Sequence, residues 1–353
     1  MICVDNRNKE GPLLGFGTAE EREIVISVDF TLPQKEKIPL KEKRPKVIVI
    51  SGPTAVGKTK LSLFIAEVLG GEIVSADSMQ IYKGMDIGTA KASIAERSLI
   101  PHHLIDIREI SDKFNVVDFY FEAHKAIQKV IASGAVPIVV GGTGFYIRAL
   151  IYGPPSGPPS IVSVREKLEA EMEEKGAEAL YERLKKIDPE YAETITVKDK
   201  QKIIRALEII SLTDRKVSFF SKQISSQMMS YDFRCWFLHK SKDLLYQSIE
   251  KRCDDMLHEG LIDEVKALLE QGLARNSTAS QAIGYKQCLD YLSTAQSDKD
   301  YLHFVTQFKQ ASRRYAKRQF TWFRKEPLFR WLDMEEISFE RAAEIIIQDY
   351  EIS

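Results

Sequence analysis

One short segment constrains the fold of this chain more than any other. Residues 52–59 read Gly-Pro-Thr-Ala-Val-Gly-Lys-Thr and directly follow the apolar run 47–50. The pattern G-x-x-x-x-G-K-T between a strand and a helix is that of a phosphate-binding loop, whose backbone N–H groups and helix N-terminus face phosphate oxygens. Lys58 would add a positive charge, and Thr59 a hydroxyl that can bind Mg²⁺. The chain is therefore predicted to bind a ligand that carries phosphate groups.

Strands and helices are predicted to alternate after this loop. Hydrophobic spacing indicates helices at 58–69 and 118–133 and strands at 72–77 and 136–140. Such alternation is typical of a parallel sheet covered by helices on both faces, which binds ligands at the carboxyl ends of its strands. Because the phosphate-binding loop, Asp77 and Gly141–Gly144 all follow predicted strands, we expect them to meet at one edge of the sheet.

The composition divides the chain into three parts. Residues 1–44 read as an N-terminal extension without an assigned function, in which only Ile24–Phe30 is predicted as a strand. A spacer rich in proline and glycine lies at 153–159 and is followed by helical patterns at 163–176, 177–186 and 199–212. We therefore expect a helical insertion domain at 157–230. The core would comprise 45–156 and 231–353, with a strand at 234–238 rejoining the sheet and four or five helices after Lys242.

Composition excludes several classes of protein. The net charge is −1, no run of eighteen apolar residues exists, and the first ten residues do not resemble a secretion signal. The four cysteines are far apart and none has zinc-ligand spacing. These features predict a reduced, cytoplasmic protein without a membrane span or a structural zinc site.

A basic segment near the C-terminus stands out against the neutral whole. Residues 309–325 contain seven Lys or Arg and no acid, with four aromatic residues between them. Such a run is either a solvated helix face or a surface for an RNA backbone. The candidate RNA contacts within it are Arg314, Lys317 and Arg318.

Two further candidates, Asp77 and Arg252, have more than one interpretation. Asp77 could hold Mg²⁺ through water, take a proton from a nucleophile, or cap a turn. Arg252 lies in a charged helical pattern, where a solvated face is the simpler interpretation and contact with diphosphate oxygens the alternative. His102 and His103 are interpreted as structural. The strand at 136–140 ends in glycines instead of the acid that holds Mg²⁺ in many nucleotide-hydrolysing proteins, which favours a phosphate that is bound but not hydrolysed.

Taken together, separated motifs resemble those of the tRNA dimethylallyltransferase family, also called tRNA isopentenyltransferases. The resemblance runs from about Lys46 to Trp331, and the block SADSMQIYKGMDIGTAK at 75–91 is its most specific part. The other motifs are residues 52–59, PHHLID at 101–106, GGTGFY at 141–146, QKIIR at 201–205, Gly284-Tyr285 and RYAKRQFTWFR at 314–324. The chain lacks the zinc finger of the eukaryotic members and so resembles the bacterial type.

The resemblance implies an α/β, P-loop NTPase-like core and a reaction. The family transfers the dimethylallyl group from dimethylallyl diphosphate to N6 of adenosine 37 in the anticodon stem-loop of tRNA. The resemblance implies Mg²⁺ held with Thr59, and catalytic roles for Asp77 as general base and for Lys58, Thr59 and Arg252 on the diphosphate. The sequence does not constrain the oligomeric state, and a monomer is the default expectation. The implied donor-binding residues are Gly52, Pro53, Thr54, Ala55, Val56, Gly57, Lys58 and Thr59. The implied tRNA-binding residues are Asp77, Ser78, Met79, Gln80, Thr143, Arg165, Gln201, Lys202, Ile203, Ile204, Arg205, Gln281, Gly284 and Lys286.

Three other functions remain open at this point. An adenylate isopentenyltransferase would use free AMP or ATP as acceptor and would need neither the insertion nor the basic segment. A small-molecule P-loop kinase would need a conventional acid for Mg²⁺, which the sequence does not supply. An RNA-binding protein with a vestigial phosphate loop would not need Lys58, Thr59 and Asp77 to be intact.

Overall fold

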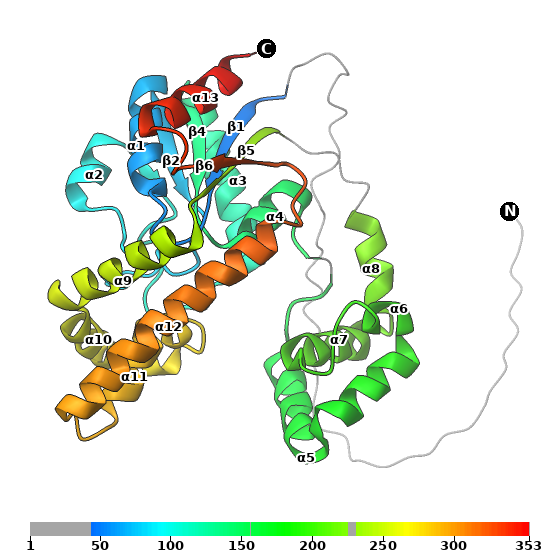
Figure 1. Ribbon diagram of the computed structural model, residues 1–353. Helices are drawn as coiled ribbons and strands as arrows, with labels where there is room; N and C mark the ends of the chain where they lie inside the picture. Colours follow the sequence, from blue (N-terminus) through cyan, green and yellow to red (C-terminus); the bar gives the residue numbers. More distant parts are fainter. Residues whose placement is uncertain (1–43, 156, 225–230, 353) are drawn as a thin grey trace, which may run out of the picture. The chain divides into compact units, whose positions relative to one another are not determined.

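The core of the protein is one parallel sheet of six strands. The computed structural model describes residues 44–155, 157–224 and 231–352, and for 221–224 only the backbone. The strand order is β3-β2-β4-β1-β5-β6, and every neighbouring pair is parallel (Figure 1). The strands are β1 (Lys46–Ser51), β2 (Gly71–Ser75), β3 (His102–His103), β4 (Val136–Val140), β5 (Asp232–His239) and β6 (Phe329–Asp333). The central strand β1 is almost wholly buried, which explains its unbroken apolar sequence.

Helices cover both faces of this sheet. One face carries α1 (Lys58–Leu69) and α13 (Phe339–Glu351), which contact each other, and the other carries α3 (Val116–Ala132) and α4 (Gly144–Tyr152). The short helix α2 (Ile94–Leu99) precedes β3. Local sequence sets several helix ends: Asn115 and Asp118 form a capping box that begins α3, and Gly70 ends α1 in the left-handed conformation. This arrangement leaves the carboxyl ends of the strands free for loops that could bind a ligand.

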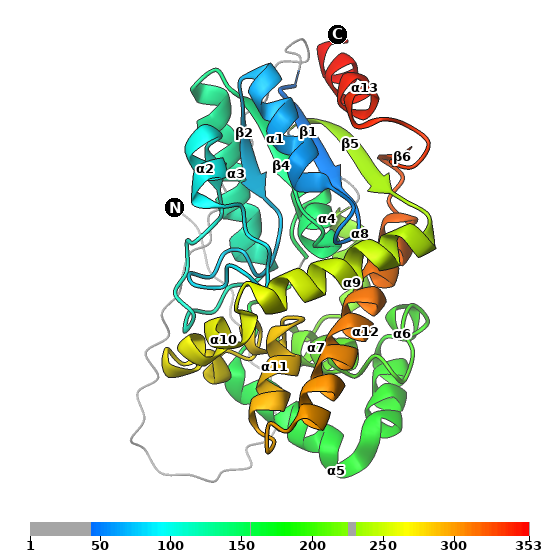
Figure 2. The same ribbon diagram turned by 60° about the vertical axis from the view of Figure 1, so that its left-hand side comes forward.

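A group of C-terminal helices follows β5. They are α9 (Lys242–His258), α10 (Leu261–Glu270), α11 (Tyr285–Leu292) and α12 (Asp298–Phe323), with two 3-10 turns at Leu273–Arg275 and Ala279–Gln281. Helix α12 packs against both α9 and α4 (Figure 2). Their buried side chains, among them Phe304 and Phe308, belong to the same hydrophobic cluster as the sheet. The C-terminal helices are therefore part of the core.

Residues 157–224 form helices with a hydrophobic cluster of their own. The elements are α5 (Val162–Ile187), α6 (Pro189–Ala192), α7 (Lys200–Thr213) and α8 (Val217–Ile224). Gly176 has a φ of 82° and interrupts α5, as expected from the two separate helical patterns predicted there. Leu180, Leu184 and Ile203 lie at the centre of the cluster.

The predicted α/β fold is confirmed, with three differences in its elements. Strand β2 ends at Ser75, so Asp77 lies in the loop beyond it and not at the strand end. Strands β3 and β6 were not predicted, because each is short and gains its strand conformation from pairing with a distant neighbour. The strand predicted at 24–30 lies outside the described residues. In the part of the chain that the structure describes, no helix combines the length and apolar character needed to cross a membrane.

Candidate active site

A cavity opens where the loops after β1, β2 and β4 meet. Its volume is about 110 Å³. The three segments expected at this edge all contribute to its lining, and α9 and α12 supply further residues. The polar lining residues are Thr54, Lys58, Thr59, Ser62, Ser75, Asp77, Gln80, Thr89, His102, Arg252, Tyr315 and Gln319. Their convergence makes this cavity the candidate active site.

The phosphate-binding loop turns sharply between β1 and α1. Gly57, which precedes α1, has a φ of 106°, a conformation that side chains rarely adopt. No side chain caps the helix there, so the first N–H groups of α1 are not occupied by a capping residue. The ammonium of Lys58 donates to the backbone oxygens of Gly52 and Pro53, both at 2.9 Å. Burial and the nearby charge of Arg252 lower the pKa of Lys58 to about 7, although Asp77 opposes the shift.

Asp77 caps a turn, which is one of the three roles considered for it, and it also lines the cavity. Its Oδ1 accepts a hydrogen bond from the backbone N–H of Met79 at 2.9 Å, which caps the turn after β2. The same carboxylate lines the cavity and interacts electrostatically with both Lys58 and Arg252. An anionic group between two cations can take up a proton or balance the charge of a ligand.

Arg252 does not lie on a solvated helix face, which corrects the simpler interpretation of its sequence. The side chain is half-buried on α9 and lines the cavity. Its Nε is buried and has no hydrogen-bond partner among the described residues. Burial lowers its pKa, while Asp77 acts in the opposite direction. A buried, unpaired guanidinium donor beside Lys58 is suited to an anionic ligand.

Helix α12 closes the cavity with two residues that the sequence reasoning did not select. Gln319 accepts from the backbone N–H of Thr54 at 3.1 Å and donates to the backbone oxygen of Gly142 at 2.9 Å. Tyr315, one turn earlier, hydrogen-bonds Thr143, whose hydroxyl accepts from the backbone N–H of Ser78 at 3.1 Å. In the sequence, the only feature that could have indicated Tyr315 and Gln319 is their i, i+4 spacing, which places them on one face of an otherwise basic helix.

His102 contributes to the cavity wall, although it was interpreted as structural. Its Nδ1 lies 2.7 Å from the backbone oxygen of Ile100, and burial lowers its pKa. His103 instead pairs with Glu72 at 2.6 Å. Both residues make structural contacts as predicted, but only His102 reaches the cavity.

The glycines after β4 are required for close packing. A Cβ atom on Gly141 would lie 2.2 Å from the backbone oxygen of Ala76, and one on Gly142 would lie 2.1 Å from Nε2 of Gln319. These contacts bring the end of β4 against the loop that carries Asp77 and against α12. Packing therefore explains why glycines stand where many P-loop proteins have an acid.

The predicted tRNA-binding residues fall into exposed and buried groups. Four of them lie near the cavity and are half-buried: Ser78, Met79, Gln80 and Thr143. Gln281 and Lys286 are exposed and hydrogen-bond each other at 3.2 Å. Gly284 is buried beneath the ring of Phe308 and offers no surface. In the helices at 157–224, Gln201 and Lys202 are exposed, and Arg165 hydrogen-bonds Gln201.

Three of these residues have other tasks in the structure. The side chains of Ile203 and Ile204 lie in the hydrophobic cluster at 0% and 2% exposure, so they cannot contact an RNA and are withdrawn as candidates. Two apolar residues in the matched motif complete the helix core instead. Arg205 pairs with Glu208 at 2.7 Å and donates to the backbone oxygen of Pro158.

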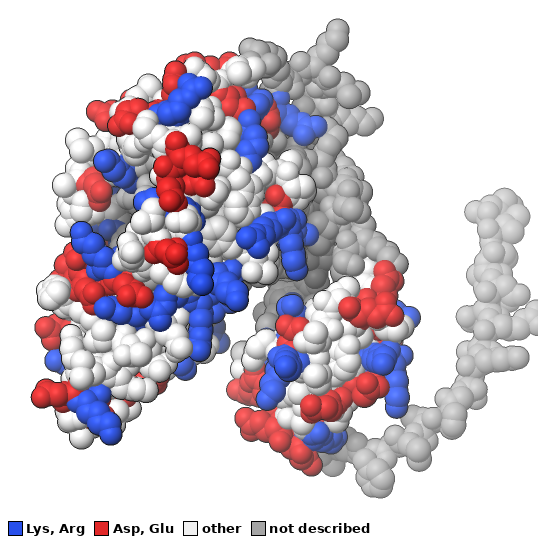
Figure 3. Space-filling view, viewed as in Figure 1, with Lys and Arg blue, Asp and Glu red and all other residues white. Residues whose placement is uncertain are grey.

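The basic segment is divided between structural pairing and an exposed surface. Lys309 and Arg313 pair with Asp254 and Glu250 on α9, so their charges are neutralised. Figure 3 shows Lys and Arg side chains gathered along α12. Among the described residues, five exposed cations of this segment form no ion pair: Arg314, Lys317, Arg318, Arg324 and Lys325.

Comparisons with known proteins agree with the motifs. A family model described as IPP transferase matches residues 80–326. The tRNA dimethylallyltransferase of Protochlamydia amoebophila is 55% identical over 343 residues, which cover 96% of this chain and 100% of the relative. That of Chlamydia pneumoniae is 46% identical over 336 residues, with 95% and 97% covered.

Solved structures agree as well. A tRNA isopentenylpyrophosphate transferase from Bacillus halodurans is 41% identical with a TM-score of 0.64, and the match covers 87% of this chain and 95% of that chain. A eukaryotic dimethylallyltransferase acting on tRNA is 29% identical with a TM-score of 0.72, covering 88% and 81%. The resemblance found from the motifs is confirmed, and the chain belongs to the IPP transferase family, together with these tRNA dimethylallyltransferases.

Proposed function

We propose that this protein transfers the dimethylallyl group of dimethylallyl diphosphate to N6 of adenosine 37 in tRNA and releases diphosphate. The observation that carries the proposal is one cavity lined by Lys58, Asp77 and Arg252, whose buried Nε has no hydrogen-bond partner in the part of the chain that the structure describes. The cations suit a diphosphate, and the carboxylate suits an acceptor that must lose a proton. Membership of the family supplies the identity of both substrates.

The donor would bind through the loop 52–59. Backbone N–H groups of the loop and of the first turn of α1 would hydrogen-bond the diphosphate oxygens. Lys58 would exchange its two carbonyl partners for phosphate oxygens, and Arg252 would approach from α9. As the carbon–oxygen bond breaks, diphosphate leaves with the electron pair, and these fixed cations stabilise the charge that develops on it.

The Mg²⁺ ion implied by the family would be held by Thr59. This residue stands in the first turn of α1 and lines the cavity, and its hydroxyl makes no hydrogen bond among the described residues. A free hydroxyl at that place suits an ion that takes most of its ligands from phosphate and water. When bound, the ion would neutralise part of the charge on the leaving diphosphate.

The acceptor adenosine would be held beside Asp77. Its exocyclic amine attacks the allylic carbon, a carbon–nitrogen bond forms, and the Asp77 carboxylate takes the proton that N6 loses. The base must leave its stack to enter the cavity, which costs little in a single-stranded loop. The exposed residues Gln281 and Lys286 and the basic residues of α12 would bind the anticodon stem-loop.

The remaining expectations belong to the same proposal. Residues 157–230 would act as a helical domain that contacts the tRNA through Arg165, Gln201 and Lys202. Residues 1–44 would be an extension outside the catalytic core, which would comprise 45–156 and 231–353. The protein would act in the cytoplasm as a monomer.

The direct test measures the reaction product. Purified protein is incubated with dimethylallyl diphosphate, Mg²⁺ and unmodified tRNA, and the nucleosides are analysed by mass spectrometry. A parallel reaction contains AMP instead of tRNA, and a third contains ATP in place of the donor. We expect a five-carbon mass gain on one tRNA adenosine and none on AMP. Gain on AMP alone would assign the protein to the adenylate-modifying enzymes, and ATP consumption without any gain would indicate a kinase.

A further inference from the structure

A carboxylate from α10 holds the loop that forms one wall of the cavity. Glu264 accepts backbone N–H groups of three consecutive residues, Asp86 at 2.9 Å, Ile87 at 2.7 Å and Gly88 at 3.2 Å. It also accepts the hydroxyl of Tyr285 at 2.5 Å. Hydrogen bonds to a charged acceptor are roughly twice as strong as those between neutral groups. One side chain therefore fixes a loop 176 to 178 positions away in the sequence.

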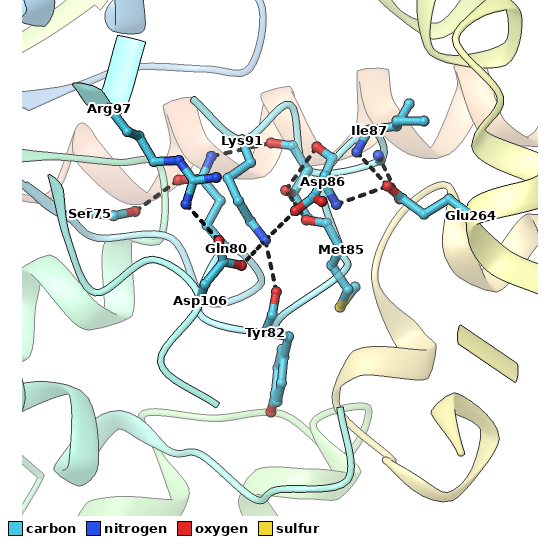
Figure 4. A network of polar contacts seen from close by, with 12 residues as sticks. Ser75, Gln80, Tyr82, Met85, Asp86, Ile87, Lys91, Arg97, Asp106 and Glu264 are labelled. Atoms are coloured by element: carbon cyan, nitrogen blue, oxygen red, sulfur yellow. Dashed lines mark hydrogen bonds and ion pairs between the residues drawn. The ribbon is translucent and has the colours of Figure 1, made fainter. Parts of the chain in front are cut away.

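A buried cation holds the same loop from the other side. The Lys91 side chain is only 1% exposed, and its ammonium donates to the backbone oxygen of Tyr82 at 2.8 Å. It also pairs with Asp86 at 2.6 Å and with Asp106 at 2.5 Å. Figure 4 shows Lys91 between these three partners and Glu264 facing the backbone at Asp86 and Ile87. The loop is thus fastened to two separate parts of the fold.

Hydrogen bonds connect the loop held by Glu264 and Lys91 to strand β2, which leads to Asp77. The hydroxyl of Thr89 donates to the backbone oxygen of Met85 at 2.7 Å, and the backbone oxygen of Thr89 accepts from Gln80 at 3.3 Å. Gln80 in turn accepts the hydroxyl of Ser75 at 2.9 Å. Ser75 is the last residue of β2 and lies two residues before Asp77. Ser75, Asp77, Gln80 and Thr89 all line the cavity.

We propose that Glu264 is a positioning residue for the transfer reaction. By binding the N–H groups of residues 86–88 it holds the cavity wall at 75–90 in the conformation that places the acceptor base beside Asp77. This inference rests on the proposed function. The hydrogen bonds of Glu264 among the described residues go to residues 86–88 and Tyr285 and not to the phosphate-binding loop 52–59, so the donor would still bind when Glu264 is changed.

The proposal predicts a graded loss of turnover. Glu264→Gln keeps one acceptor oxygen but turns an amide NH₂ toward the Gly88 N–H, so kcat should fall about tenfold, and Glu264→Ala should lower it further. Tyr285→Phe removes one of four donors and should change kcat by less than about threefold. The Kd for dimethylallyl diphosphate, measured by calorimetry, should stay within about twofold of the wild-type value.

Glu270→Gln on the same helix is the matched control, because Glu270 is exposed and makes no ion pair among the described residues. Amide hydrogen exchange over residues 76–91 is followed in the same variants and needs no catalytic activity. We expect faster exchange in that segment for both Glu264 variants and unchanged exchange in the control. Wild-type kcat in folded Glu264→Ala, unaltered exchange at 76–91, or a parallel loss of donor binding would each overturn the proposal. An inactive wild-type protein would contradict the proposed function instead, and the exchange experiment would still test Glu264.

Discussion

At the scale of single residues, three ionisable side chains line one small cavity. Lys58, Arg252 and Asp77 line the same cavity of about 110 Å³ and influence one another electrostatically. When Lys58 is protonated, two cations and one carboxylate line the cavity, and an anionic ligand can neutralise the surplus positive charge. Proton acceptance by Asp77 during turnover and proton uptake by Lys58 on donor binding can be measured separately.

The carboxylate of Asp77 should be needed for turnover and not for RNA binding. Asp77→Asn preserves the oxygen that accepts the Met79 N–H but cannot accept a proton from N6. We expect kcat to fall by about 100-fold or more, as for loss of a general base, with the Kd for tRNA within a few-fold. Single-turnover kinetics and filter binding measure the two quantities. Asp290→Ala, an exposed carboxylate on α11, serves as the control, and unchanged turnover in Asp77→Asn would remove Asp77 from the mechanism.

Donor binding should take up a proton through Lys58. Because burial and Arg252 lower its pKa to about 7, Lys58 is mostly neutral above that pH in the free protein. A bound diphosphate favours the charged form, so affinity should fall by up to about tenfold for each pH unit above 7. Calorimetry at about pH 8 in buffers of different ionisation enthalpy should show uptake approaching one proton. Lys58→Met should abolish the uptake, and equal uptake in that variant would assign the proton to another group.

At this scale, the residues of the site that belong to local motifs could be predicted from the sequence. Residues 52–59, Asp77 and Gly141–Gly144 were expected at one edge, and each of these segments contributes to the cavity lining, through Thr54, Lys58, Thr59, Asp77, Gly141 and Gly142. Gln319 and Glu264 were not selected, because their partners lie 265 and 176 to 178 positions away. No local pattern distinguishes a glutamine or glutamate with such partners from one that faces solvent.

At the scale of elements, α12 has two different faces. Ser312, Ala316, Gln319 and Phe323 are buried toward the core, as the helical period requires. The opposite face carries Arg314, Lys317 and Arg318, which are exposed. The sequence alone left two interpretations of this segment open, and the pairing of Lys309 and Arg313 with α9 shows that part of its charge is structural.

The exposed face of α12 should contribute salt-dependent affinity for tRNA. Arg314→Glu should weaken tRNA binding and lower the slope of log K against log salt by about one, because one phosphate contact is lost. The control is Lys129→Glu, which has the same change in charge in the last turn of α3, close to the amino end of β4 and so at the opposite edge of the sheet. Filter binding over a range of salt concentrations measures both slopes. Equal slopes for Arg314→Glu and wild type would make this face a solvated one.

At the scale of the whole molecule, strand order explains why the cavity lies where it does. Strands β3, β2 and β4 lie on one side of β1, with β4 next to it, and β5 and β6 lie on the other side. The loops after β1, β2 and β4 are therefore neighbours at the carboxyl edge. The α/β class and this edge followed from alternation and motifs. The full order did not, since β6 lies in a mostly helical region and joins the sheet only by pairing with β5.

The two separate hydrophobic clusters predict that donor binding and tRNA binding depend on different parts of the chain. Among the described residues, the second cluster contains only residues between Val164 and Val217, whereas the sheet and the C-terminal helices share the first cluster. Removing the part of the chain that contains the second cluster should therefore leave the part with the first cluster folded, whereas removing residues from within a single core would unfold it.

Replacing residues 160–228 by a flexible linker of about fifteen residues should preserve cooperative thermal unfolding and leave the Kd for dimethylallyl diphosphate within about threefold. Modification of tRNA should fall strongly, because Arg165, Gln201 and Lys202 are lost with the segment. Circular dichroism, calorimetry and nucleoside mass spectrometry measure the three properties. Loss of donor binding would show that these helices are needed to form the cavity, and unimpaired modification would show that the tRNA is bound by the core alone.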